Sequence, residues 1–142
     1  MYEYNCLIRR VIDGDNVEVD IDLGFGVWLK KESIRLHGID AHEYRTSDPR
    51  EKVFGTYAKK QVEETLEHSM LNVLPVKLIS HKFNKGKYGR IIGDLQIGPH
   101  GTLAEYLLES KIVMPYTNDG MLFDTYKAEV EKHLIAEGKV TL

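Results

Sequence analysis

Charged residues gather at three places in this sequence of 142 residues, each at the end of a stretch that has the pattern of a β-strand. The three groups are Asp13 and Asp15; Arg35, Asp40 and Glu43; and Lys85, Lys87 and Arg90. Each group alone has an ordinary explanation, because aspartates are common in turns and charged side chains at strand ends are often simply solvated. Together they combine carboxylates with cations, and this combination suits catalysis on a phosphate group.

Cleavage of a phosphodiester requires these residue types. The reaction needs cations on the phosphoryl oxygens, a positioned water and stabilisation of the leaving oxygen. Asp15 and Asp40 offer hard oxygen ligands of the kind that bind Ca²⁺ or Mg²⁺, and Glu43 remains to act on the water. Arg35 and Arg90 can donate paired hydrogen bonds to phosphate oxygens. Loss of such a donor typically lowers the rate by about 10²–10³.

Three strands are expected before the first helix. Residues 7–12 form the first, and residues 17–23 alternate apolar with acidic residues, which indicates a strand with one buried face. The sequence Asp13-Gly14-Asp15-Asn16 between them predicts a hairpin turn. After the break at Gly24-Phe25-Gly26, residues 28–39 resume extended structure.

A helix is expected to begin near residue 49. Asp48 is a typical N-cap, Pro49 fits the first helical position, and Glu51 completes a capping-box pattern. The residues predicted to face the core are Phe54, Ala58, Val62 and Leu66.

Two more strands and two helices complete the chain. The strands span residues 76–81 and 90–97, and the cap at Thr102 starts a helix that reaches about residue 111. The last helix ends at Gly138. The apolar residues expected to face inward are Leu103, Tyr106 and Leu107 in the second helix, and Leu122, Tyr126, Val130 and Leu134 in the third.

Length and composition favour one domain over residues 1–142. The order of the elements predicts an α+β fold, a five-stranded Greek-key barrel of the OB type with three helices. The single cysteine, Cys6, lies among strand residues and is expected to be a buried thiol. No apolar run is long enough to span a membrane, and the net charge of −3 neither indicates nor excludes a polyanionic partner.

Three motifs resemble those of the thermonuclease family, the staphylococcal-nuclease-like nucleases. They are VIDGDN at residues 11–16, IRLHGIDAHE at residues 34–43 and KYGR at residues 87–90, and their spacing is similar to that of the family. The resemblance extends over nearly the whole chain. It implies an OB-fold barrel with three helices and Ca²⁺-dependent cleavage of DNA and RNA. Mg²⁺ and Mn²⁺ are further candidates for the metal.

The resemblance also implies a role for each site residue. Asp15 and Asp40 would bind calcium together with the backbone carbonyl of Ala41, and Asp13 would lie near the metal. Glu43 would be the general base or would orient the water. Arg35 and Arg90 would hold the scissile phosphate, and the residues that would line the nucleotide pocket are Lys87, Tyr88 and Tyr116.

Two residues depart from the family pattern within the second motif. The family commonly has Thr-Pro where this chain has Ala41-His42, so the loop that carries Glu43 is expected to be less rigid. In the first motif, Asn16 replaces a threonine.

Two other functions fit parts of the pattern. A non-catalytic OB-fold that binds nucleic acid or protein would share the fold, but such domains usually lack the acidic ligands and arginines retained here. A zinc hydrolase would use His37 and His42 with Asp40 or Glu43.

DNA and RNA are the expected partners of a monomer that needs no obligate protein partner. The first residues lack the pattern of a signal peptide, which favours a cytoplasmic protein unless a leader was removed or release occurs by lysis.

Overall fold

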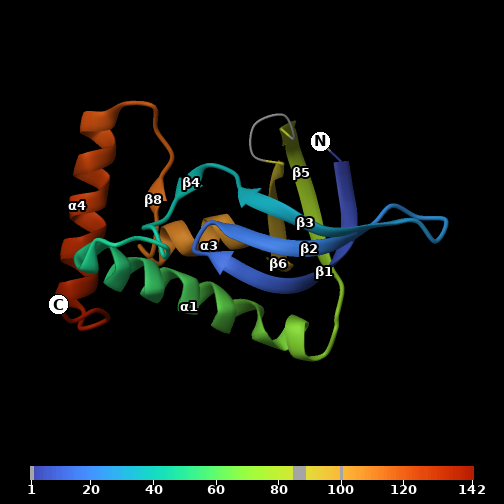
Figure 1. Ribbon diagram of the computed structural model, residues 1–142, viewed down its shortest axis with the longest axis horizontal. Helices are drawn as coiled ribbons and strands as arrows, with labels where there is room; N and C mark the ends of the chain where they lie inside the picture. Colours follow the sequence, from blue (N-terminus) through green and yellow to red (C-terminus); the bar gives the residue numbers. More distant parts are fainter. Residues whose placement is uncertain (1, 85–88, 100) are drawn as a thin grey trace.

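The computed structural model describes residues 2–84, 89–99 and 101–142, and five of its strands form a closed barrel (Figure 1). The barrel strands are β1 (Tyr2–Asp13), β2 (Asn16–Asp22), β3 (Trp28–Leu36), β5 (Val76–Asn84) and β6 (Arg90–Gly98). They pair in the order β3-β2-β1-β5-β6, and a further pairing of β3 with β6 closes the sheet. That last pairing is parallel and the other barrel pairings are antiparallel. The predicted α+β, OB-type barrel with three helices is confirmed.

Helix α1 (Pro49–Leu71) lies along the barrel and contacts β1. Its predicted cap is confirmed, because the Asp48 side chain accepts hydrogen bonds from the N–H groups of Arg50 and Glu51. The predicted core residues are buried: Phe54, Ala58, Val62 and Leu66. The capping box is incomplete, however, since the Glu51 carboxylate accepts a hydrogen bond from the N–H of Glu43 rather than completing the cap.

The two C-terminal helices are α3 (Leu103–Glu109) and α4 (Gly120–Ala136). Thr102 caps α3 as predicted. The prediction was wrong for Tyr106, which is 41% exposed, and for Leu122, which is 40% exposed. In both helices the buried stripe is narrower than the apolar residues suggest. In α3, Ala104 is buried beside Leu103 and Leu107.

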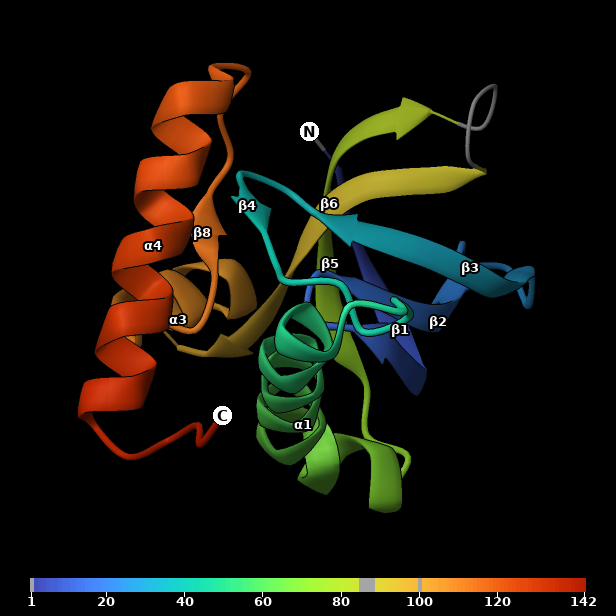
Figure 2. The same ribbon diagram turned by 60° about the vertical axis from the view of Figure 1, so that its left-hand side comes forward.

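Short strands connect the barrel to the C-terminal part of the chain. The stretch predicted as one strand to residue 39 ends at Leu36, and Gly38, with φ of 80°, turns the chain into β4 (Ile39–Asp40). β4 pairs with β8 (Met114–Pro115), while β7 (Gly101–Thr102) extends the main sheet beside β6. Figure 2 shows β8 between α4 and β4. This pairing brings α4 to the segment that follows Asp40.

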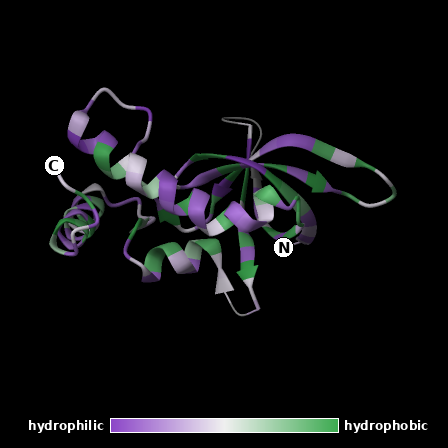
Figure 3. Cartoon of the chain, turned by 90° about the horizontal axis from the view of Figure 1, so that it is seen from below, coloured by the Kyte–Doolittle hydropathy of each residue, from purple (hydrophilic) through white to green (hydrophobic). Residues whose placement is uncertain are grey.

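The buried apolar residues form two clusters. The larger one fills the barrel under α1 and α3, and hydrophobic residues run through the converging strands in Figure 3. The smaller one joins the start of α1 to β8 and α4, and consists of Phe54, Met114, Val130, Leu134 and Val140. Cys6 is buried in the larger cluster, as predicted. Among the described residues, no helix has the length and apolar character needed to cross a bilayer.

Candidate active site

Asp15, Arg35 and Asp40 meet at one end of the barrel. Asp15 lies in the β1–β2 turn, Arg35 near the end of β3, and Asp40 in β4. Arg35 Nη2 donates a hydrogen bond to Asp40 Oδ1 and lies 3.6 Å from Asp15 Oδ2. The guanidinium therefore neutralises two carboxylates that would otherwise repel each other, and it joins the first two sequence motifs.

Backbone groups fix these carboxylates more firmly. The N–H of Ala41 donates to Asp15 Oδ2 at 2.9 Å, and the N–H of Leu36 donates to the carbonyl of Asp15 at 2.8 Å. The β1–β2 turn is thus tied to both β3 and the segment after β4. The approach is close, because a Cβ added at Gly14 would lie 2.8 Å from the Cβ of Ala41.

Arg90 lies on the strand next to that of Arg35. In the parallel pairing of β3 with β6, Arg35 is opposite Ile92 and Ser33 is opposite Arg90. Residues two positions apart on a strand share a face, so the two arginines extend from the same face of the sheet. Both are partly buried. The register therefore places two arginines on one face of neighbouring strands, and the contact of Arg90 with a phosphate stays a prediction.

Glu43 lies in the loop between β4 and α1 and lines a cavity of about 410 Å³. The other residues that line this cavity are Asp40, Ala41, Glu51, Thr117, Asn118, Gly120, Phe123 and Lys127. Partial burial raises the pKa of Glu43, and the negative charges of Asp15, Glu51 and Asp40 act in the same direction. A raised carboxyl pKa lies closer to neutral pH, which favours proton transfer.

Two further carboxyl groups show the same electrostatic crowding. Burial raises the pKa of Asp13 to about 7; the carboxyl group of Asp15 adds to the effect through its hydrogen bond and its charge, and the N–H of Asp15 opposes it. Burial also raises the pKa of Asp40, with the charge of Asp15 acting the same way and Arg35 opposing it. The site without a metal thus has more negative charge than its surroundings easily stabilise.

This donor set fits a hard divalent cation. Asp15, Asp40 and the carbonyl of Ala41 are oxygen donors, which suit Ca²⁺ or Mg²⁺. Arg35 contacts both Asp15 and Asp40, and the N–H of Ala41 donates to Asp15, so the residues that carry the three donors are neighbours. A bound cation would also relieve the crowding that helps to raise the pKa values of Asp40 and Glu43.

Helix α1 packs directly against the backbone of Glu43. A Cβ added at Gly55 would lie 2.1 Å from the carbonyl oxygen of Glu43, so only glycine allows this contact. Glu51, on the same helix, accepts the N–H of Glu43 at 2.8 Å and pairs with Lys127 of α4 at 2.5 Å. Sequence reasoning missed Lys127 because no local pattern relates it to a loop more than eighty residues earlier.

The predicted nucleotide-binding residues have different outcomes. Lys87 and Tyr88 lie outside the described residues, so their roles stay predictions. Tyr116 follows β8 and is 55% exposed. Its N–H donates to the carbonyl of Gly38 at 2.9 Å, and its hydroxyl donates to Asn118, which lines the cavity. Tyr116 therefore lies at the rim of the site, where substrate contact stays a prediction.

The histidines of the zinc alternative do not converge. His37 stacks on His81, with ring centroids 4.2 Å apart, whereas His42 is buried and stacks on Phe54 at 4.9 Å. His42 Nε2 contacts Glu131 of α4 at 2.8 Å. Where the family commonly has proline, this chain thus has a buried, bonded side chain next to Glu43, and the lower rigidity of the loop stays a prediction.

Comparison with known proteins agrees with this geometry. The model of a family described as staphylococcal nuclease homologue matches residues 33–138, which include Arg35, Asp40, Glu43 and Arg90. A search of curated proteins found no match. The family match covers well over half of the 142 residues, and the barrel with three helices is the fold that it implies. The chain belongs to the staphylococcal nuclease homologue family.

Proposed function

We propose that this protein is a metal-dependent nuclease that hydrolyses phosphodiester bonds in DNA and RNA. The observation that carries the proposal is the meeting of Asp15, Arg35 and Asp40 from three separate elements, with Glu43 on the adjoining cavity wall. A binding module would not need this costly arrangement of crowded carboxylates. Membership of the family supports a nuclease-type domain.

The proposed metal is Ca²⁺, held by Asp15, Asp40 and the carbonyl of Ala41, with Asp13 nearby. Mg²⁺ and Mn²⁺ are possible substitutes. When bound, the cation would supply positive charge to stabilise negative charge on the phosphate.

The chain's own side chains would perform the remaining steps. Glu43 accepts a proton from a water whose oxygen forms a bond to phosphorus, and the bond from phosphorus to the 5′ oxygen breaks. That oxygen takes a proton from a solvent water as it leaves, so the products have a 3′-phosphate and a 5′-hydroxyl. Arg35 and Arg90 donate hydrogen bonds to the phosphoryl oxygens, where charge increases in the transition state. Lys87, Tyr88 and Tyr116 bind the nucleotide.

The test is digestion of single-stranded DNA and of RNA by the purified protein. Parallel reactions contain Ca²⁺, Mg²⁺, Mn²⁺, Zn²⁺ or a chelator, and the product ends are analysed. We expect cutting with Ca²⁺, none with chelator, and 3′-phosphate ends. Binding without cutting under every metal would overturn the proposal in favour of a non-catalytic OB-fold, and activity specific to Zn²⁺ would overturn the metal assignment.

A further inference from the structure

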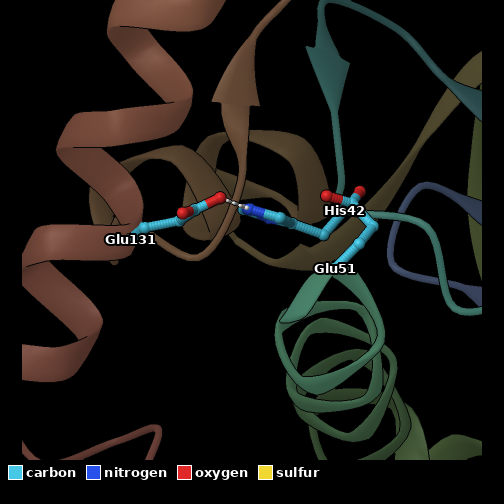
Figure 4. A group of neighbouring side chains, drawn as sticks. All are labelled: His42, Glu51 and Glu131. Atoms are coloured by element: carbon cyan, nitrogen blue, oxygen red, sulfur yellow. Dashed lines mark hydrogen bonds and ion pairs between the residues drawn. The ribbon is translucent and has the colours of Figure 1, made fainter. Parts of the chain in front are cut away.

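His42 occupies an unusual position for a histidine beside an exposed glutamate. Its side chain is fully buried, stacks on Phe54 of α1 and contacts Glu131 of α4 through Nε2. Figure 4 shows Glu131 extending from α4 toward the ring, with Glu51 approaching from the start of α1. The residue immediately before Glu43 is thus enclosed between two helices.

Glu131 connects this histidine to α1 as well. Its Oε2 contacts His42, and its Oε1 accepts hydrogen bonds from Arg50 Nη2 at 2.9 Å and Nε at 3.2 Å. Both oxygens of the carboxylate thus have partners, Arg50 on Oε1 and His42 on Oε2, which restricts the orientation of the carboxylate. The acceptor for His42 is therefore itself held in place.

A second connection runs parallel to the first. Lys127 and Glu131 are four residues apart on α4 and so lie on the same side of the helix. Lys127 pairs with Glu51, which accepts the N–H of Glu43. Of these two side chains, Lys127 is thus linked to the backbone of Glu43 through Glu51, and Glu131 contacts the side chain of His42 directly.

The same group of side chains has donor types that bind transition metals, since ligand atoms of His42, Glu51 and Glu131 lie within 4.8 Å of one another. Lys127 and Arg50 already neutralise the two carboxylates. Because a metal would have to displace both cations, the charge balance favours a structural link over a metal site.

We propose that His42 and Glu131 are positioning residues, through which α4 sets the orientation of Glu43 for catalysis. The proposal rests on the proposed nuclease function. Loss of either partner releases the loop at the position next to Glu43, and a displacement of about 1 Å in a catalytic group can lower the rate by about 10²-fold. Because His42 and Glu131 act through one contact, removing both side chains should lower kcat little more than removing either one.

The test compares His42→Ala, Glu131→Ala and the double variant by single-turnover and steady-state cleavage of single-stranded DNA in Ca²⁺. We expect kcat to fall about 10- to 100-fold in each single variant, with no further fall in the double variant and KM changed less than about twofold. His42→Gln, which keeps a donor near the Nε2 position, should recover most of kcat. Glu129→Ala removes the same charge from an exposed site on α4 and should match the parent.

Amide hydrogen exchange gives a readout that does not need activity. In His42→Ala, exchange at residues 41–46 should be faster, with the barrel strands unchanged. A parent protein that cuts no substrate would refute the proposed function, and the exchange result alone would then decide whether α4 holds the loop. The proposal would be overturned if both single variants had the kcat and the loop exchange of the parent. It would also be overturned if the losses of kcat were strictly additive in the double variant and His42→Gln failed to recover kcat.

Discussion

Arg35 supplies the positive charge that stabilises the two carboxylates of the site when no metal is bound. It contacts Asp40 and Asp15, and the exposed fractions of the three side chains are 15%, 26% and 15% in that order. The negative charge of Asp15 helps to raise the pKa of Asp40, so this pair of carboxylates needs a nearby cation. A bound metal would share this role with Arg35.

Arg35→Ala should therefore lower the free energy of unfolding by about 2 kcal/mol in chelator, less than the roughly 3–5 kcal/mol lost when a fully buried pair is broken. Added Ca²⁺ should stabilise the variant more than the parent, because the cation replaces the missing charge. Urea denaturation with and without Ca²⁺ measures both effects. Arg10→Ala, which removes a largely exposed partner of Glu18, is the control and should cost under about 1 kcal/mol. Equal Ca²⁺ effects in parent and Arg35→Ala would contradict this account.

Asp13 gives the site a pH dependence. Its pKa is about 7 in the folded protein against an ordinary value of 3.8, so between these values the folded state binds the proton more tightly than the unfolded state. The contribution of Asp13 to the free energy of unfolding is therefore fully present below pH 3.8 and is lost as the pH rises through 7.

Asp13→Asn removes this titration. In chelator at pH 8 the variant should be more stable than the parent by about 2 kcal/mol, a figure reduced for partial exposure, and the difference should vanish near pH 4. Thermal unfolding across this pH range measures it. Identical pH profiles for the two proteins would show that Asp13 is not the group responsible.

At the scale of elements, the contact of α1 with the Glu43 loop depends on Gly55. A methyl group there would overlap the carbonyl of Glu43, so helix and loop must separate. This contact brings the start of a long helix within reach of a catalytic side chain.

Gly55→Ala should destabilise the protein by about 1–3 kcal/mol, although the same change at an unobstructed helical site usually stabilises it by about 0.5–1 kcal/mol. Gly120→Ala is the matched control, since a Cβ there meets no atom within 4 Å. Chemical denaturation of both variants decides the point. A gain of stability at residue 55 would mean that the helix and the loop are not held together as described.

The elements also show what sequence patterns can and cannot predict. Alternation in residues 17–23 and the Asp48 cap depend on neighbours in the chain, and the strand and the cap are both confirmed. The predicted single buried face was wrong at two positions: Leu23 lies beyond the strand and is 40% exposed, and Asp20 is buried because Arg9 and the N–H of Lys31 bond to it. The position of Glu51 predicted a capping box, but the Glu51 carboxylate instead accepts a hydrogen bond from the N–H of Glu43. A local sequence pattern indicates which partners a side chain could have, and tertiary packing decides which of them it contacts.

At the scale of the whole molecule, the barrel and α4 meet around the Glu43 loop. The smaller apolar cluster packs α4 onto the start of α1, and the β4–β8 pairing joins the C-terminal part to Asp40. The fold class and the grouping of the carboxylates with Arg35 were predictable because their motifs are short and distinctive. The link from His42 to Glu131 was not, since those residues are 89 positions apart and neither belongs to a motif that pairs them.

The central claim is that Glu43 acts on water at this site, and Glu43→Gln tests it most directly. The measurement is the single-turnover rate of single-stranded DNA cleavage in Ca²⁺ for the parent, for Glu43→Gln, and for Glu63→Gln, which makes the same change at an exposed position on α1. The account predicts a fall of about 10²–10⁴ for Glu43→Gln and no change for the control. Cleavage by Glu43→Gln at the parent rate would contradict it.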